Sequence, residues 1–384
     1  MATPRVHINP GLITWARTTA GFEPADLADK LDVEASVLSQ WESGTSAPRL
    51  TQLEAIAQHC KRPLAALLLP EPPPEPQHLP DFRILAEPQA SALSPEARFA
   101  IRRARWLRSA ILDLYHEAGL TTEAHLPQVD PKGDLQGGAL AIREWLGITT
   151  ECQFRWEDSS EALKGWRAAL HSRNVLVLQM KMDMKEMRAF SLAFRDLPVI
   201  VVNISDASNG RIFSIFHELG HVIRQTGGIC LGERSLLERH PSPEERLCNR
   251  FAGEVLVPTG SVELDEPRPP FDELASRFKV SRYVVLYRAL DLGATPREQF
   301  QQLIAGWLAE DRQAAEQERR RQEARDRKGG ASGAQRALWE LGPDLASLVI
   351  AAESSGLMTS GEAAECLNVK ARELDKVADL LAGA

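Results

Sequence analysis

The chain has 384 residues, of which 43% are hydrophobic and 26% charged, and its formal net charge is −8. This length indicates a globular protein of roughly two or three domains, and no apolar run approaches the roughly 20 residues that cross a bilayer. The negative charge excludes a general attraction to nucleic acid, so any DNA binding would need a local surface suited to it.

The five cysteines are scattered along the chain and form no C-x-x-C pair. An odd number without this spacing argues against a disulfide framework and against a cysteine zinc finger. The N-terminus lacks the charged start, apolar core and cleavage site of a signal peptide. We therefore expect a cytoplasmic protein that does not interact with membranes.

Residues 1–69 are predicted to form a compact all-α domain. Amphipathic helices are expected at Ala25–Leu31, Val37–Glu42 and Leu50–His59, and Gly44 stops the second of them as a C-capping glycine does. A proline-rich run follows, and because proline cannot continue a helix we predict a linker over residues 70–92.

Further helices are expected beyond the linker, at residues 94–119, Leu135–Leu146 and Ser160–His171. The hydrophobic period then changes. Three short β-branched or aromatic runs predict a small sheet, and they are Val175–Leu178, Phe190–Phe194 and Val199–Asn203. Helices follow again at residues 210–225 and at Pro243–Leu256, and residues 299–384 are expected to form a helical segment that Gly329 and Gly330 interrupt.

One spacing of small and apolar residues recurs in Leu27–Val33, Leu274–Val280 and Ala363–Val369. The small alanine in each copy lets two helices of a helix-turn-helix approach closely. The first copy alone has the surroundings of a DNA-reading unit. We interpret the three copies as helical hairpins with a shared packing solution, and the second predicts helix-turn-helix-like helices at residues 271–293.

A metal-binding pattern lies in the helix predicted at residues 210–225. His217, Glu218 and His221 form H-E-x-x-H, and residues four apart share one face of a helix. Both imidazoles can therefore reach one Zn²⁺ ion, with Glu218 beside them as a general base. The alternative is a pair of core histidines satisfied by hydrogen bonds, but the strand-loop-helix context favours zinc.

A catalytic zinc needs a third protein ligand, for which Glu245 on the next helix is our first candidate. Asn249 shares a face with Glu245 and could orient a ligating imidazole. A competing role for Glu245 is the capping box that begins at Ser242, and the neighbours of Cys248 indicate core packing. The other candidate ligands are Glu244, Glu254 and His240.

These segments resemble the ImmA/IrrE metallopeptidases. The resemblance runs through Pro198–Asn203, Phe213–His221 and Glu245–Pro258 and covers roughly residues 160–290, with Gly253 standing where alanine is usual. It implies one zinc ion per chain held by His217, His221 and Glu245, with Glu218 as the catalytic glutamate. It also implies a role in transcription regulation or stress response, through cleavage of a repressor.

The N-terminus resembles an Xre-type helix-turn-helix domain through Leu38–Gly44. Arg62–Pro70 and Pro80–Arg83 are similar to segments found where the two domains are fused. Together the resemblances predict a mostly helical α+β fold. Its parts are a helix-turn-helix domain at 1–69, a zincin-like peptidase domain at 93–298 with a small sheet packed on the H-E-x-x-H helix, and a helical segment at 299–384.

A DNA-reading role would bring four side chains of the first domain to the duplex, namely Ser36, Ser39, Gln40 and Arg49. The charge balance of residues 1–69 is slightly acidic, and Glu34 and Glu42 bracket the reading helix. Two hypotheses therefore stay open for this domain. It binds DNA as part of a homodimer, or it docks a protein partner.

The predicted activity is zinc-dependent endopeptidase cleavage of a protein partner, such as a transcriptional repressor or a related regulator. An extended substrate could pair with an edge strand at Phe190–Phe194. The candidate donors for the oxyanion of the transition state are His240, Arg250 and Tyr283. The alternative is an antitoxin-like DNA-binding regulator with a non-catalytic zincin fold, against which the intact Glu218 counts.

Overall fold

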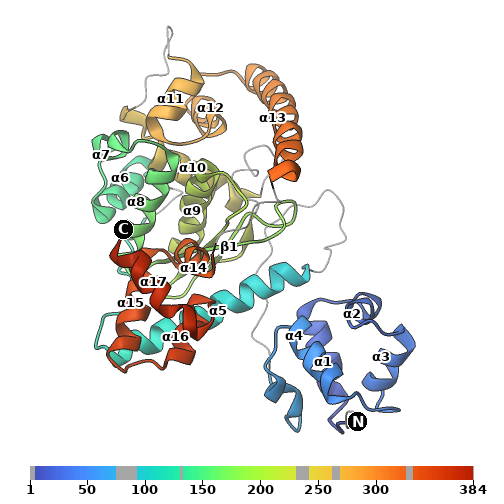
Figure 1. The fold of residues 1–384 in the computed structure, drawn as a ribbon. Coiled ribbons are helices and arrows are strands. Elements are labelled where there is room, and N and C mark those ends of the chain that lie inside the picture. The colour runs from blue at the N-terminus through green and yellow to red at the C-terminus, as the bar shows by residue number, and fades with distance from the viewer. Residues whose placement is uncertain are drawn as a thin grey trace. The chain divides into compact units, whose positions relative to one another are not determined.

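The computed structural model describes residues 5–74, 93–129, 133–230, 242–261, 269–325 and 332–383. The chain divides into two compact units, one of residues 1–78 and 85–103 and the other of residues 79–84 and 104–384. Helices predominate and one small sheet accompanies them (Figure 1), which confirms the predicted fold class. None of the described helices is long and apolar enough to cross a membrane.

The first unit is a helical domain built on a small apolar core. Its helices are α1 (Gly11–Ala20), α2 (Pro24–Lys30), α3 (Ala35–Glu42), α4 (Leu50–His59), the 3₁₀ turn η1 (Leu64–Leu68) and the start of α5 (Pro95–Glu117). Buried apolar side chains of α1 to α4 and η1 meet inside, among them Leu12, Leu27, Leu38, Leu53 and Leu67, and the partly buried Phe99 of α5 packs against them. The predicted α4 is confirmed to the residue, whereas α2 and α3 begin one or two residues earlier than expected.

The spacing that recurs three times corresponds to one backbone geometry. In each copy the amide of the valine donates to the carbonyl of the alanine five residues earlier, at 3.1, 3.0 and 3.0 Å for Val33, Val280 and Val369. The residue before each valine has a positive φ of 52–57°. The pattern therefore marks a common way to close a helix before its partner helix begins.

The sheet lies in the second unit and has the order β1-β3-β2-β4. Its strands are β1 (Leu176–Met180), β2 (Ala189–Leu192), β3 (Val199–Asn203) and β4 (Ile229–Cys230). β1 runs parallel to β3, and β2 is antiparallel to both β3 and β4. Every residue of β1, β2 and β3 is buried, which explains their continuous apolar runs.

The prediction of an edge strand at Phe190–Phe194 is wrong in two respects. The strand ends at Leu192, and it is internal because β4 pairs with Ala189 and Phe190. The reason is a close approach that glycine permits, since a Cβ on Gly227 would lie 2.7 Å from the amide nitrogen of Ala193. Glycine there lets the chain return beside β2 after the metal-motif helix ends.

Helices cover the sheet and carry the site. α9 (Ser208–Ile223) packs against β2 and β3 and also contacts α8 (Ser159–His171) and α10 (Pro243–Leu256). The core between them is aromatic, with Trp166 of α8 edge-on to Phe216 of α9 at 4.8 Å between ring centroids. α6 (Leu135–Leu146) packs on α10, and the short α7 (Thr150–Arg155) was not predicted. The helix carrying H-E-x-x-H is thus held on several sides.

The remaining helices follow in chain order as α11 (Phe271–Phe278), α12 (Arg282–Asp291), α13 (Arg297–Arg325), α14 (Gly333–Leu341), α15 (Pro343–Ser354), α16 (Ser360–Leu367) and α17 (Leu374–Ala382). α14 packs on β1, at one edge of the sheet. The buried Arg167 of α8 donates to the carbonyls of Trp339 and Glu340, at 3.3 and 3.1 Å, where α14 ends. Gln179 of β1 donates to Trp339 as well, at 2.7 Å.

Candidate metal centre

Three buried side chains from two helices converge in the second unit. His217 and His221 of α9 and Glu245 of α10 each offer a ligand atom, and these atoms lie within 4.8 Å of one another. The Nε2 atom of His217 is 3.3 Å from one Glu245 carboxylate oxygen, and the Nε2 atom of His221 is 3.2 Å from the other. The structure thus brings together the three residues predicted to bind zinc.

The close approach of α9 and α10 makes this convergence possible. A Cβ on Gly220, between the two histidines, would lie 3.2 Å from the Sγ atom of Cys248 and from the ring of Phe251. A larger residue at position 220 would push α10, and Glu245 with it, away from the imidazoles. Cys248 therefore lies in the helix interface, as predicted from its neighbours.

The start of α10 shows how Glu245 serves both the helix and the site. The Ser242 hydroxyl accepts a hydrogen bond from the Glu245 amide at 3.1 Å, and Pro243 occupies the first helical position. The Glu245 carboxylate points to the two imidazoles instead of returning to the cap. The capping box is thus half formed, and the conflict between the two roles of Glu245 is absent.

The electrostatics of the cluster suit a cation. Burial alone would raise the pKa of the Glu245 carboxyl, but His217 and His221 hold it well below its usual range. Burial likewise would lower the pKa of His217, yet Glu245 keeps that pKa above its usual value. A buried carboxylate needs a compensating positive charge, and two imidazoles with one carboxylate are a donor set of catalytic zinc sites. The residues present therefore fit a zinc ion.

Two further side chains touch the outer nitrogens of the histidines. The Asn249 side-chain oxygen lies 2.8 Å from Nδ1 of His217, the contact expected of a residue that orients a ligand. The Thr226 hydroxyl lies 3.2 Å from Nδ1 of His221. Sequence reasoning missed Thr226, because its place depends on the turn after α9 and on no motif spacing. Glu218, the predicted base, is fully buried on the same helix.

The other candidate ligands are engaged elsewhere. Glu254 forms an ion pair with Arg288 and accepts hydrogen bonds from Thr259, away from the histidines. Glu244 forms an ion pair with Arg224 at 2.6 Å. Glu244 and Cys248 also lie near His221, but burial and then Glu245 hold the pKa of the Cys248 thiol well above its usual value. The Cys248 Sγ atom packs in the interface of α9 and α10, close to Gly220.

The candidates for oxyanion stabilisation are likewise held by other groups. Arg250 donates to Asp291 at 2.8 Å, and the Tyr283 hydroxyl donates to Asp311 at 2.6 Å. His240 and the segment around it lie outside the described residues. The structure thus gives neither Arg250 nor Tyr283 a contact with the three-residue cluster.

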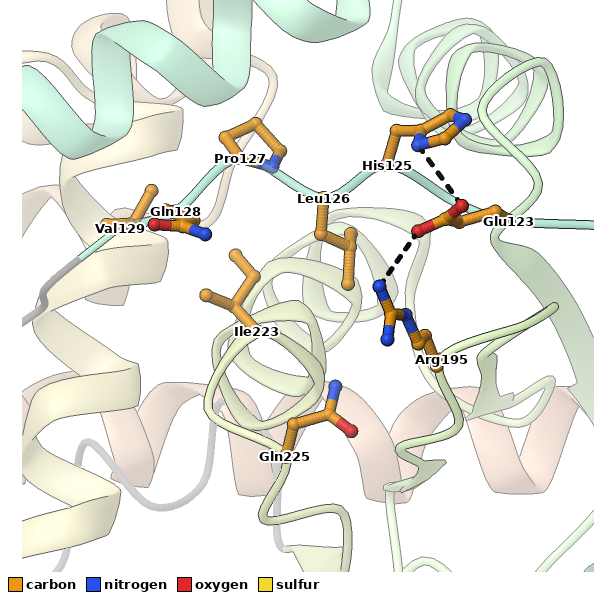
Figure 2. Close-up of a pocket in the computed structure, with 9 residues that line it drawn as sticks. All are labelled: Glu123, His125, Leu126, Pro127, Gln128, Val129, Arg195, Ile223 and Gln225. Atoms are coloured by element: carbon orange, nitrogen blue, oxygen red, sulfur yellow. Dashed lines mark hydrogen bonds and ion pairs between the residues drawn. The ribbon is translucent and has the colours of Figure 1, made fainter.

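A cavity of about 790 Å³ lies beside the C-terminal end of α9 (Figure 2). Ile223 and Gln225 line it from the end of that helix, opposite residues 123–129 and Arg195. Glu123 lies 3.5 Å from the Arg195 guanidinium and 3.6 Å from the His125 ring. None of the predicted metal ligands lines this cavity, so it neighbours the cluster without including it.

The side chains predicted to contact DNA are all exposed in the first unit. Four side chains are exposed on α3 and at the start of α4, namely Ser36, Ser39, Gln40 and Arg49. Glu42 is not a free acid, because Arg17 of α1 donates two hydrogen bonds to its carboxylate at 2.7 and 3.2 Å. One of the two acids that bracket the reading helix is therefore neutralised within the domain.

Two family models match the chain. Residues 171–290 match the Peptidase_M78 family, described as the IrrE N-terminal-like domain, and residues 13–67 match a helix-turn-helix family. No curated protein and no solved structure matches the chain. The first match includes all three residues of the cluster, and both matches confirm the resemblances found in the sequence.

Proposed function

From the IrrE N-terminal-like domain at residues 171–290, we propose that this chain is a zinc-dependent endopeptidase. The proposal rests on the convergence of the buried side chains of His217, His221 and Glu245. Glu218, next to His217 on the same helix, is fully buried as well. Three protein ligands leave a coordination position for water, which distinguishes a catalytic zinc site from a structural one. A structural site would have no use for a general base at position 218.

A zinc ion bound there supplies a Lewis acid that polarises the scissile carbonyl and lowers the pKa of a water molecule toward about 7. Glu218 takes a proton from the attacking water as its oxygen bonds to the carbonyl carbon. The carbon–nitrogen bond then breaks, and Glu218 delivers the proton to the leaving amine. Asn249 holds the His217 ring in place through Nδ1 during these steps.

We propose as substrate a protein partner, in particular a transcriptional repressor or a related regulator. Support comes from the presence of a helix-turn-helix domain and a peptidase-family domain in one chain. The rival function is a DNA-binding regulator whose zincin fold is not catalytic. Two assays distinguish these functions. One tests cleavage of repressors encoded near the gene for this protein, and the other is a gel shift with the DNA upstream of that gene.

The metal content of the purified protein tests the site. Wild-type protein is expected to retain one zinc ion per chain, and the His217→Ala and Glu245→Ala variants to lose it, because each removes one of three protein ligands. Zinc is measured by atomic absorption after dialysis against a weak chelator. Glu273→Ala serves as the control, since that glutamate is exposed on α11. Equal zinc in the His217→Ala variant would remove the basis of the proposal.

We propose DNA as the ligand of the helix-turn-helix domain, with α3 in the major groove. The favourable observation is the Arg17–Glu42 pair, which removes one negative charge from the reading helix. Gln40→Ala is expected to weaken binding to a cognate site by about 1–3 kcal/mol, the worth of a bidentate base contact. Arg49→Ala is expected to weaken binding to all sequences alike and to flatten the salt dependence. Fluorescence anisotropy on duplex DNA measures both, and no binding at low salt would favour the protein-docking alternative.

A further inference from the structure

The end of α9 folds the chain back onto the second histidine of the motif. The Gln225 amide donates to the Val222 carbonyl at 3.0 Å, and the Thr226 amide donates to the His221 carbonyl at 2.9 Å. Gln225 has a φ of 56°, the left-handed conformation found at such helix ends. This pair of hydrogen bonds is the Schellman motif, and it brings Thr226 beside His221. The hydroxyl of Thr226 consequently reaches Nδ1 of His221, at 3.2 Å.

The direction of each hydrogen bond around Thr226 follows from its neighbours. Glu244 accepts from the Arg224 guanidinium at 2.6 and 2.8 Å. The two side chains form an ion pair, and an ionised carboxylate can only accept hydrogen bonds. The Thr226 hydroxyl has one proton and two acceptors within reach, the Glu244 carboxylate at 3.0 Å and the His221 carbonyl at 3.4 Å, neither of which can donate in return. Its oxygen must then accept a hydrogen bond from Nδ1 of His221.

This ordering determines which nitrogen of His221 is available to a metal. With a proton on Nδ1, Nε2 is the nitrogen that faces the Glu245 carboxylate, at 3.2 Å, and the one that can offer a lone pair to a metal. Without a metal, a proton on Nε2 makes this contact a hydrogen bond, and a zinc ion would take the place of that proton. The relay from Arg224 through Glu244 and Thr226 thus prepares His221 as a ligand, whereas His217 relies on the uncharged Asn249.

We infer that Thr226 is a positioning residue for the metal centre, which holds His221 in the Nδ1-protonated tautomer and so strengthens zinc binding. The inference rests on the proposed zinc site and adds a residue that no motif indicates. Outer contacts of this kind are typically worth 10–100-fold in metal affinity. Thr226→Val removes the hydroxyl at nearly constant shape and is expected to weaken zinc binding by a factor of about 10–100.

The experiment compares zinc dissociation constants of the full-length protein, measured by competition with a chromophoric chelator. Thr226→Ser keeps the hydroxyl and is expected to bind zinc nearly as well as wild type. Thr295→Val is the matched control, because Thr295 is also buried but its hydroxyl has no hydrogen-bond partner among the described residues. Replacing zinc by Co²⁺ adds a second readout, since a reoriented His221 ring would shift the visible absorption bands of the Thr226→Val protein.

A third variant guards against a folding defect. Should Thr226→Val fail to fold without metal, Glu244→Gln decides, because it removes the charge that orients the Thr226 hydroxyl and is expected to weaken zinc binding in the same direction. If the folded Thr226→Val protein binds zinc with wild-type affinity, the inference is wrong, and the proposed zinc site is unaffected. Where Thr226→Val does not fold, wild-type zinc affinity of Glu244→Gln has the same meaning. A wild-type protein that binds no zinc would overturn both.

Discussion

Glu218→Gln is expected to bind zinc as tightly as the wild-type protein and to hydrolyse its protein substrate about 10²–10⁴ times more slowly. Glutamine has nearly the shape of glutamate, so the fully buried position 218 should accommodate it. The amide cannot take a proton from water or return one to the leaving amine. The expected loss is therefore in the rate of the chemical step, with little change in substrate affinity.

The measurement is single-turnover cleavage of a partner repressor, with zinc content determined on the same samples. Glu273→Gln, an identical change at an exposed position of α11, controls for the general effect of losing one negative charge. If the zinc-loaded Glu218→Gln protein cleaves the substrate at the wild-type rate, the proposed mechanism is wrong. Loss of zinc in that variant would assign Glu218 a role in the metal site instead.

Arg288→Ala is expected to destabilise the peptidase unit by about 3–5 kcal/mol, the typical result of removing one partner of a buried ion pair. Arg288 is fully buried, and its guanidinium donates to Glu254, to the Thr259 hydroxyl and to the Val257 carbonyl. Without it, the Glu254 carboxylate keeps its charge in the interior with fewer donors. This loss should appear in urea unfolding followed by tryptophan fluorescence.

A double-mutant cycle sharpens this prediction. Glu254→Ala combined with Arg288→Ala is expected to cost clearly less than the sum of the single variants, because no charge is then left buried alone. Additive losses would mean that the two side chains stabilise the fold independently of each other. Metal binding should survive in all three proteins if they remain folded, since neither residue contacts the histidines.

The same arginine explains the one departure from the family pattern that we noted in this segment. A Cβ on Gly253 would lie 2.7 Å from Cδ of Arg288, so the alanine usual at that position has no room here. Gly253→Ala should cost about 1–3 kcal/mol, as overpacking of a core does. In the Arg288→Ala background this cost should largely disappear, and the sequence alone could not show a contact between residues so far apart in the chain.

Local signals predicted the helices well. α4, α6 and α10 begin and end where expected, because a hydrophobic period with a capping residue or a proline specifies a helix without reference to distant residues. The order of the strands depended on β4 returning beside β2, a tertiary contact, and there the prediction of an edge strand failed. Local reasoning also left Glu245 between cap and ligand. It favoured the ligand, as the resemblance did, and the packing of α10 on α9 places the carboxylate at the two imidazoles.

The docking of α14 on β1 has a practical consequence for anyone who works with the peptidase unit alone. Arg167 and Gln179 have their hydrogen-bond acceptors at the end of α14, beyond the 171–290 family match. A recombinant fragment of the second unit that ends before α14 would lose these acceptors and expose the outer edge of β1, whose side chains are all apolar apart from Gln179. Exposed strand edges self-associate, so a fragment that lacks α14 to α17 is expected to be insoluble when it is expressed.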